Sequence, residues 1–432
     1  MDRFAINQLR EWKQKIDKKP LIVNGARQTG KTWLLKEFGA KEYSNFVYFN
    51  CDSNHILRDA FKDGYEIKTL ISNFEAICAQ PISPNDTLII LDEIQEIPEA
   101  LTSLKYFCES ETKYNIVAAG SLLGLSLHSG TGFPVGKVEI LELYPMTFFE
   151  FVLAVKGHNL FDKISNESLD NFESFHTLLI QLLRQYYFTG GMPEAVNAFV
   201  QGKSPVEIRT IQKAILYSYE KDISKHSSLK DIQRIHQVWE SIPMQLAKEN
   251  KRFIYGAIKS GARAKDFELA IQWLIDAGLV YKVTRIKKPC IPLKFYEDFN
   301  SFKLFLLDCG LMGAMMDAPI DKILIGSDIF EEYKGAFTEL YVFQQIKANA
   351  ATENLGIYYF SADDSKQELD FLLQKESTII PIEVKAEENL RAKSLRQFVL
   401  DNPETHGIRF SMSAYRKQDW MTNIPLYLVD RI

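Results

Sequence analysis

The chain has 432 residues, of which 46% are hydrophobic and 25% are charged; these are ordinary proportions for a globular protein and exclude wholesale disorder. At about 150 residues per domain, this length predicts about three domains. The formal net charge of −5 excludes a general basic field for nucleic acid, so any basic surface must be local.

The five cysteines lie far apart and form no Cys-x-x-Cys pair, which argues against a disulfide framework or a zinc site and favours a reducing compartment. Charged residues interrupt residues 1–14, so no apolar run of signal-peptide length can form there. No stretch approaches the roughly 18 uninterrupted apolar residues that a membrane span needs. We therefore expect a soluble cytoplasmic protein with no membrane contact.

A glycine-rich motif directly follows the first predicted strand, residues 21–23. Its pattern is G-x-x-x-x-G-K-T, in which successive backbone N–H groups and the start of the next helix face phosphate oxygens. Lys31 is expected to reach the β- and γ-phosphates of ATP, and the Thr32 hydroxyl is a candidate ligand of Mg²⁺. The candidate nucleotide-binding residues are Gly25, Ala26, Arg27, Gln28, Thr29, Gly30, Lys31, Thr32 and Trp33.

Two further apolar runs end in polar side chains. Residues 88–91 are four aliphatics followed by Asp92 and Glu93, which predicts a central parallel strand buried on both faces. Such a strand delivers the two acids to the edge where the phosphates bind, so Asp92 is expected to hold Mg²⁺ and Glu93 to orient the attacking water. Ser121 ends the next apolar run, either as a sensor of the γ-phosphate or as a cap of the following turn.

These segments resemble a prokaryotic family of ATP-binding proteins that have an AAA-type domain and a C-terminal domain of unknown function. The resemblance implies a magnesium-dependent ATPase, in which Lys31 and Thr32 bind nucleotide and metal. It also implies that Asp92 and Glu93 are the Walker B pair and that Ser121 stands at the sensor-1 position. The stretches that carry it are GARQTGKTWLL, LIILDEIQEIP, VAAGSLLG and LELYPMTFFEF.

Because AAA proteins often complete a nucleotide site between neighbouring copies, the resemblance leaves a homo-oligomer open. It assigns no arginine finger or sensor-2 arginine, and Arg27 and Arg184 are candidates only through their nearness to motifs.

We place the ATPase core in residues 1–150 and a helical lid in residues 151–220, where apolar residues recur with helical spacing. The turn at residues 190–194, Gly-Gly-Met-Pro-Glu, interrupts this pattern. It is a hinge, a nucleotide contact or a plain connection between helices, and we favour the connection.

Residues 221–294 predict a winged helix, because three helices (231–246, 255–260 and 264–277) precede a strand at 278–283 and a basic turn. Residues 248–294 contain eleven Lys or Arg against four Asp or Glu. Clustered basic side chains gain by releasing counterions from DNA, so double-stranded DNA is a candidate partner of this segment. A solvated basic face is an equally good interpretation.

Residues 295–432 predict an α/β unit with a mixed sheet. Besides an apolar run at 305–311, we expect helices at residues 335–348 and 389–400, and strands at residues 356–360, 368–373, 378–385, 407–412 and 425–429.

Four charged residues give this C-terminal unit a second candidate site. Glu339 is on the first helix, Asp370 is on the second strand, and Glu383 and Lys385 share one face of the third. This order resembles the PD-(D/E)XK nuclease superfamily, with its restriction-endonuclease-like fold. The resemblance implies that Asp370 and Glu383 bind Mg²⁺, that Lys385 acts on water or on phosphate charge, and that Glu339 is an outer carboxylate. The alternatives are solvated charges, or a nuclease fold that has lost its chemistry.

The sequence thus predicts an α/β protein with a P-loop AAA-type parallel sheet, a helical lid, a winged-helix segment and a nuclease-like domain. The favoured function is a Mg²⁺-dependent ATPase whose nucleotide state controls the C-terminal region, acting on or near DNA. One alternative is an ATP-gated nuclease. The other is a nucleotide-regulated switch that binds DNA or protein with little turnover.

Overall fold

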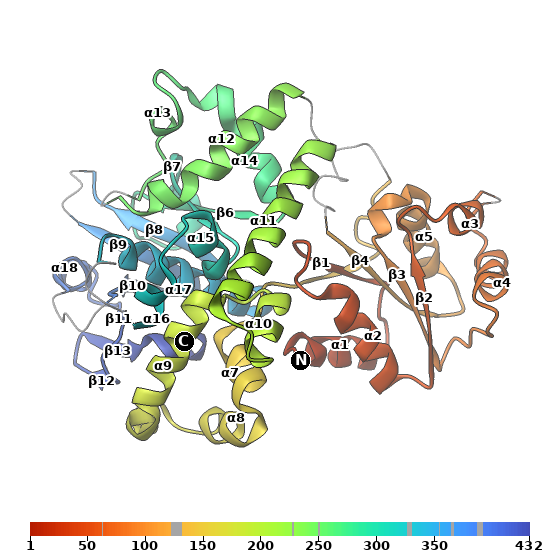
Figure 1. Cartoon of the computed structure of the whole chain (residues 1–432), viewed down its shortest axis with the longest axis horizontal. Coiled ribbons are helices and arrows are strands. Elements are labelled where there is room, and N and C mark those ends of the chain that lie inside the picture. Colours follow the sequence, from red (N-terminus) through yellow and green to blue (C-terminus); the bar gives the residue numbers. More distant parts are fainter. Residues whose placement is uncertain are drawn as a thin grey trace. The chain divides into compact units, whose positions relative to one another are not determined.

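The structure is a computed structural model that divides into two compact units, each described separately below (Figure 1). The first unit is Met1–Tyr144 with Asp276–Leu279, and the second is Pro145–Ile275 with Val280–Ile432. The residues described are 1–62, 64–121, 132–226, 229–248, 251–325, 331–353, 355–363, 367–386 and 392–432. Residues 122–124 of the VAAGSLLG stretch lie outside them.

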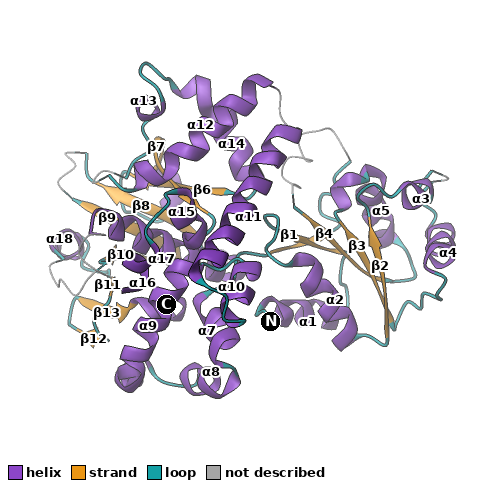
Figure 2. Ribbon diagram, viewed as in Figure 1, coloured by secondary structure: helices purple, strands orange, loops and turns teal. Residues whose placement is uncertain are grey.

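The first unit is built on a parallel sheet with the strand order β2-β3-β4-β1-β5, which confirms the predicted parallel sheet. Four of its strands, β1, β4, β3 and β2, are labelled in Figure 2. Its strands are β1 (Leu21–Asn24), β2 (Asn45–Asn50), β3 (Thr87–Asp92), β4 (Asn115–Gly120) and β5 (Glu139–Glu142). The helices around it are α1 (Ala5–Gln14), α2 (Lys31–Glu42), α3 (His55–Asp59), α4 (Ile67–Cys78) and α5 (Pro98–Glu109).

The central strand β3 is buried at every position because its aliphatic side chains pack on both faces of the sheet. Ile89 and Leu91 belong to a core cluster that contains residues of α4 and α5. Leu88 and Ile90 alternate with them and join the cluster that contains residues of α1 and α2. Because helices cover both faces of the sheet, a ligand can reach the sheet only at the ends of its strands.

The parallel pairing of β3, β4 and β1 brings the carboxyl ends of these strands to one edge of the sheet. The glycine-rich loop follows β1, Glu93 follows β3, and Ser121 follows β4. The topology therefore places the three predicted motifs at the same edge, as the sequence requires for a phosphate site.

The second unit begins with helices, in agreement with the helical pattern predicted for residues 151–220. None of the described helices in either unit has the length and hydropathy that crossing a membrane requires. The helices are α7 (Phe148–Lys156), α8 (His158–Ser165), α9 (His176–Thr189), α10 (Pro193–Val200), α11 (Pro205–His226), α12 (Leu229–Leu246), α13 (Tyr255–Ile258), α14 (Ala264–Asp276, whose last residue is counted with the first unit), α15 (Cys309–Met315), α16 (Ile320–Ile325), α17 (Glu331–Glu353) and α18 (Lys393–Asp401).

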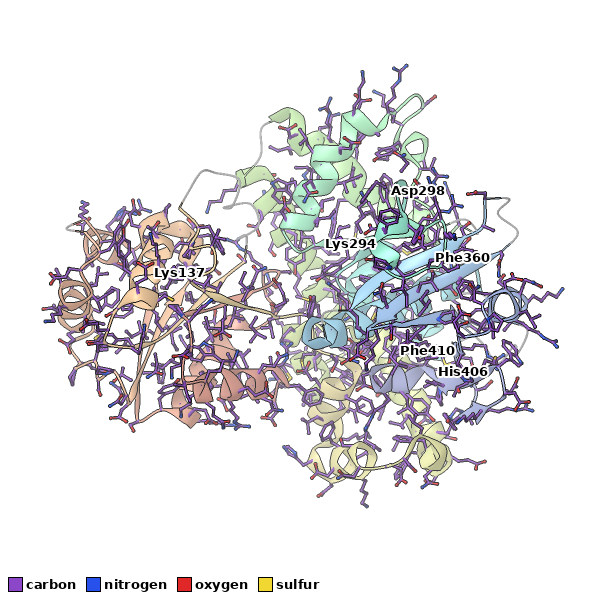
Figure 3. The ribbon with its side chains drawn as sticks, turned by 180° about the vertical axis from the view of Figure 1, so that it is seen from behind. Lys137, Lys294, Asp298, Phe360, His406 and Phe410 are labelled. Atoms are coloured by element: carbon purple, nitrogen blue, oxygen red, sulfur yellow. The ribbon has the colours of Figure 1, made fainter. Side chains whose placement is uncertain are left out.

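A mixed sheet forms the rest of this unit, with the order β12-β13-β11-β10-β9-β8-β6-β7. Phe360 of β8 and Phe410 of β11, both labelled in Figure 3, mark two of its strands. The strands are β6 (Val280–Ile286), β7 (Glu297–Leu306), β8 (Gly356–Ser361), β9 (Glu368–Lys375), β10 (Thr378–Val384), β11 (Gly407–Ser411), β12 (Arg416–Lys417) and β13 (Met421–Pro425).

The predicted strand at residues 278–283, which was assigned to the winged helix, belongs to this sheet. Strand β6 pairs with β7 and also with β8, through Arg285 opposite Tyr359 and Ile286 opposite Phe360. The predicted boundary at residue 294 therefore falls between two paired strands. The division of the chain into functional domains stays a prediction.

The prediction of a strand at residues 425–429 is wrong. The strand is β13, which ends at Pro425, and Leu426–Arg431 is a 3₁₀ helix. Residues 426–429 are apolar and buried, and a short apolar run fits a strand or a helix equally well. The polar Asn423 is buried within β13 because its side-chain oxygen accepts hydrogen bonds from Arg409 Nε and Ser411 Oγ, both at 2.8 Å.

The Gly190-Gly191 turn is a close backbone junction inside the second unit. The Gly191 N–H donates to Asp308 Oδ2 at 2.6 Å, and the Met146 N–H donates to the Gly191 carbonyl at 2.7 Å. A Cβ atom at Gly190 would collide with the Asp308 carboxylate, and one at Gly191 would collide with the Met146 carbonyl. Packing therefore accounts for both glycines, which favours the interpretation as a connection between helices.

Candidate nucleotide-binding site

The loop between β1 and α2 requires glycine at its two ends. Gly30 caps α2 with φ 92°, a left-handed conformation that is cheap only for glycine. Gly25 has φ 153°, and a Cβ atom there would collide with the carbonyl oxygen of Leu143. The glycines of the motif thus shape a tight loop that ends at the N-terminus of a helix, where anions are stabilised.

Lys31 lies buried at the start of α2, with its ammonium group turned toward this loop. Its Nζ donates to the carbonyl oxygens of Gly25 and Ala26, each at 2.8 Å. Burial lowers the pKa of Lys31 to about 8, while the charges of Glu93 and Asp92 act in the opposite direction. Two carbonyl groups and two nearby carboxylates therefore hold this cation beside the loop.

Thr32 and Asp92 meet although they come from different motifs. Thr32 Oγ1 donates to Asp92 Oδ2 at 2.7 Å, and the same oxygen accepts a hydrogen bond from the Tyr48 hydroxyl at 2.8 Å. Hydroxyl and carboxylate oxygens are the ligand types that Mg²⁺ prefers. The pair therefore fits a magnesium ion, with Thr32 and Asp92 as the residues that would hold it.

Glu93 lies at the end of β3 in a left-handed conformation, with φ 52°. Its Oε2 accepts hydrogen bonds from Gln95 Nε2 at 2.6 Å and from Ser121 Oγ at 3.3 Å. Arg27 Nε lies 3.4 Å from Ser121 Oγ, so the phosphate loop, β3 and β4 are linked through these side chains. A strained backbone at a strand end is typical of functional sites.

Residues 17–152 match the family model of an AAA domain. This chain has an AAA-type ATPase core. Residues 180–322 and 334–429 match two further models, both described only as domains of unknown function (DUF8612 and DUF4143). A comparison with curated proteins found no match.

Two solved structures are similar to the chain at low identity. One is the Walker-type ATPase PABY2304 of Pyrococcus abyssi, with 14% identity, coverage of 73% of this chain and 95% of the other, and a TM-score of 0.45. The second is the ORC1 protein of Aeropyrum pernix in complex with DNA, with 13% identity, coverage of 74% and 94%, and a TM-score of 0.30. Both scores are low, so the assignment of the AAA core rests on the family model and on the order of its sheet.

The AAA core also contains site residues that the sequence did not reveal. Arg3, which is buried, donates from Nη1 to the Thr29 carbonyl at 2.7 Å and from Nη2 to the Tyr144 carbonyl at 2.6 Å, and so anchors the phosphate loop. Tyr48 on β2 holds Asp92, as described above. Neither residue belongs to a motif, and only the fold brings them to the site. Trp33, a predicted nucleotide contact, is 41% exposed at the start of α2.

The second candidate site lies in the mixed sheet, and lysines accompany its acids. Glu339 on α17 forms ion pairs with Lys251 and, at 3.8 Å, with Lys303. Lys303 also lies 2.9 Å from Glu368 Oε1. The sequence offered one signal for this lysine, since it interrupts an apolar run in β7 and is fully buried there.

The other two predicted acids of this site are also engaged. Asp370 Oδ2 accepts a hydrogen bond from the Val384 N–H at 2.7 Å. Lys385 Nζ lies 2.7 Å from Glu383 Oε1, and burial raises the pKa of Glu383 despite that partner. Within the described ranges, no group of three His, Cys, Asp or Glu side chains is arranged to hold a metal ion. As they stand, these residues do not fit a divalent cation.

Proposed function

We propose that this protein is a magnesium-dependent ATPase of the AAA type whose nucleotide state controls its C-terminal region. The observation that carries the proposal is the 2.7 Å contact between Thr32 Oγ1 and Asp92 Oδ2. A hydroxyl group at the phosphate loop and a carboxylate on a strand two places away in the sheet meet beside Lys31 and Glu93. These side chains correspond to the lysine, the two magnesium-binding groups and the water-orienting residue that recur in P-loop ATPases.

The chain's own groups have separate tasks in this mechanism. The backbone amides of the loop bind the phosphates, and Lys31 exchanges the carbonyls of Gly25 and Ala26 for phosphate oxygens. Glu93 orients the attacking water and accepts its proton, while Gln95 and Ser121 fix the position of the Glu93 carboxylate. The magnesium ion supplies positive charge against the β- and γ-phosphates when it is bound.

ATP turnover, measured with and without double-stranded DNA, tests the proposal in the whole protein. We expect hydrolysis that requires Mg²⁺, and a change of rate on adding DNA if the C-terminal region engages it. Absence of Mg²⁺-dependent hydrolysis, with and without DNA, would contradict the proposed ATPase. An unchanged rate with DNA would favour a substrate other than DNA.

A second candidate function, DNA binding, is favoured by the surface of the β6–β7 hairpin. Lys287, Lys288 and Lys294 are exposed there, and Lys294 is labelled in Figure 3. Phe295 is 79% exposed and Phe299 is 69% exposed. Exposed cations can neutralise phosphates, and exposed aromatic rings can stack on bases. We propose this surface as the DNA contact of the second unit.

Changing both Lys287 and Lys288 to serine is expected to weaken retention of double-stranded DNA. Because each lysine neutralises one phosphate, the slope of log affinity against log salt should fall by about two. Binding measured over a salt series checks this, with Lys203→Ser as an exposed control in the same unit. Unchanged affinity and slope in the double variant would place the DNA contact elsewhere.

The same samples distinguish an ATP-gated nuclease, the alternative that the superfamily resemblance suggests. Plasmid and linear DNA are incubated with Mg²⁺ or Mn²⁺, beside the Asp370→Ala variant. Scission that disappears in the variant would support the nuclease. Retention without scission would support a nucleotide-regulated DNA-binding switch. A homo-oligomer stays a prediction, which sedimentation with and without ATP tests.

A further inference from the structure

The acid cluster of the mixed sheet contains as many cations as carboxylates. The carboxylates are Glu339, Glu368, Asp370 and Glu383. Lys251 and Lys303 lie at Glu339, Lys303 also contacts Glu368, and Lys385 contacts Glu383. Burial lowers the pKa of Arg409, and the negative charge of Glu383 opposes this shift. Four acids thus face four basic groups.

This balance leaves little electrostatic attraction for a divalent cation. Mg²⁺ or Mn²⁺ added to the cluster would bring a surplus of about two positive charges into a largely buried site, where like charges repel strongly. The side chain of Glu339 is only 2% exposed and that of Lys303 only 1% exposed, so water can screen little of this repulsion. A cation could enter only if one ammonium group left.

Lys251 differs from the other basic groups in how it is held. It comes from the segment that joins α12 to α13, whereas Lys303, Lys385 and Arg409 come from the sheet or its immediate end. Because Lys251 lies outside the strands, its side chain can move away from Glu339 without disturbing the sheet. Burial lowers the pKa of Lys251 to about 8, while the negative charge of Asp370 acts in the opposite direction. Its ammonium group forms an ion pair with Glu339.

Two oxygens show that the cluster retains coordinating capacity. Glu339 Oε2 and Glu383 Oε2 are buried and accept no hydrogen bond from any described residue. Buried carboxylate oxygens normally have such partners. We infer that lysine ammonium groups neutralise this carboxylate cluster in place of a divalent cation, and that Lys251 is the group a cation must displace.

Binding of Mn²⁺ to the full-length protein tests the inference, with bound ions counted by electron paramagnetic resonance. The wild type and Asp370→Asn should bind the same number of ions, because the cluster takes none. Lys251→Met should bind one ion more, and the double variant Lys251→Met with Asp370→Asn should lose it again. Any ion held at Thr32 and Asp92 is common to all four proteins and cancels in the comparison.

The exposed Lys259→Met is the matched control and should behave as the wild type does. If Lys251→Met does not fold, as judged by circular dichroism, Lys251→Gln removes the same charge and takes its place. The inference is overturned if the wild type binds one ion more than Asp370→Asn. It is equally overturned if the folded Lys251 variant gains no ion.

Discussion

Replacing Lys31 by alanine is expected to lower the affinity for ATP by about two to four orders of magnitude. Its ammonium group would make charge-assisted hydrogen bonds to two phosphate groups, each contributing about 1.5–3 kcal/mol. The backbone amides of the loop stay in place in this variant. The loss of ATP affinity therefore measures the contribution of the lysine side chain alone. Equilibrium titration of Mg²⁺ and ATP into the variant checks this result.

Lys41→Ala is the matched control for this experiment. Lys41 is on the same helix but is exposed and pairs with Glu37 at 2.7 Å, so its removal should leave ATP affinity unchanged. Equal affinities of the Lys31 variant and the wild type would show that nucleotide binds somewhere else.

Replacing Glu93 by glutamine should leave ATP binding intact and slow hydrolysis by about 10²- to 10⁴-fold, the usual contribution of a general base. Glutamine preserves the shape of the side chain and its hydrogen bonds to Gln95 and Ser121, but it cannot accept the proton from water. A single-turnover assay with saturating ATP separates the chemical step from binding.

Glu99→Gln controls for the loss of one negative charge nearby, since Glu99 is exposed in the first turn of α5. Its hydrolysis rate should match that of the wild type. If Glu93→Gln hydrolyses ATP at the wild-type rate, another group activates the water and the proposed role of Glu93 is wrong.

The parallel sheet of the first unit was predictable because its signals are local. An uninterrupted aliphatic run such as residues 88–91 suits a strand that is covered on both faces, and β3 is buried at every position. The rule that parallel strands share one carboxyl edge then predicted that Thr32 and Asp92 would meet. Their 2.7 Å contact follows from two short motifs and one rule of topology.

Contacts that form only through tertiary packing could not be predicted from the sequence. Arg3 and Tyr48 belong to no motif; Arg3 precedes α1 and Tyr48 is on β2. In the second unit, the order of Glu339, Asp370 and Glu383 along the chain predicted that their carboxylates would lie in one site. The interruption of an apolar run marked Lys303 as unusual, but it did not show which side chains Lys303 contacts. No pattern marked Lys251, because its spacing from Glu339 in the chain carries no signal.

The structure of the protein bound to Mg²⁺ and a non-hydrolysable ATP analogue tests the central claim most directly. We expect the triphosphate over residues 25–32, with Thr32 and Asp92 at the metal ion. We also expect the ammonium group of Lys31 to have left the carbonyls of Gly25 and Ala26 for the β- and γ-phosphates. A triphosphate bound elsewhere, or a Lys31 still bonded to those two carbonyls beside a bound nucleotide, would contradict that claim.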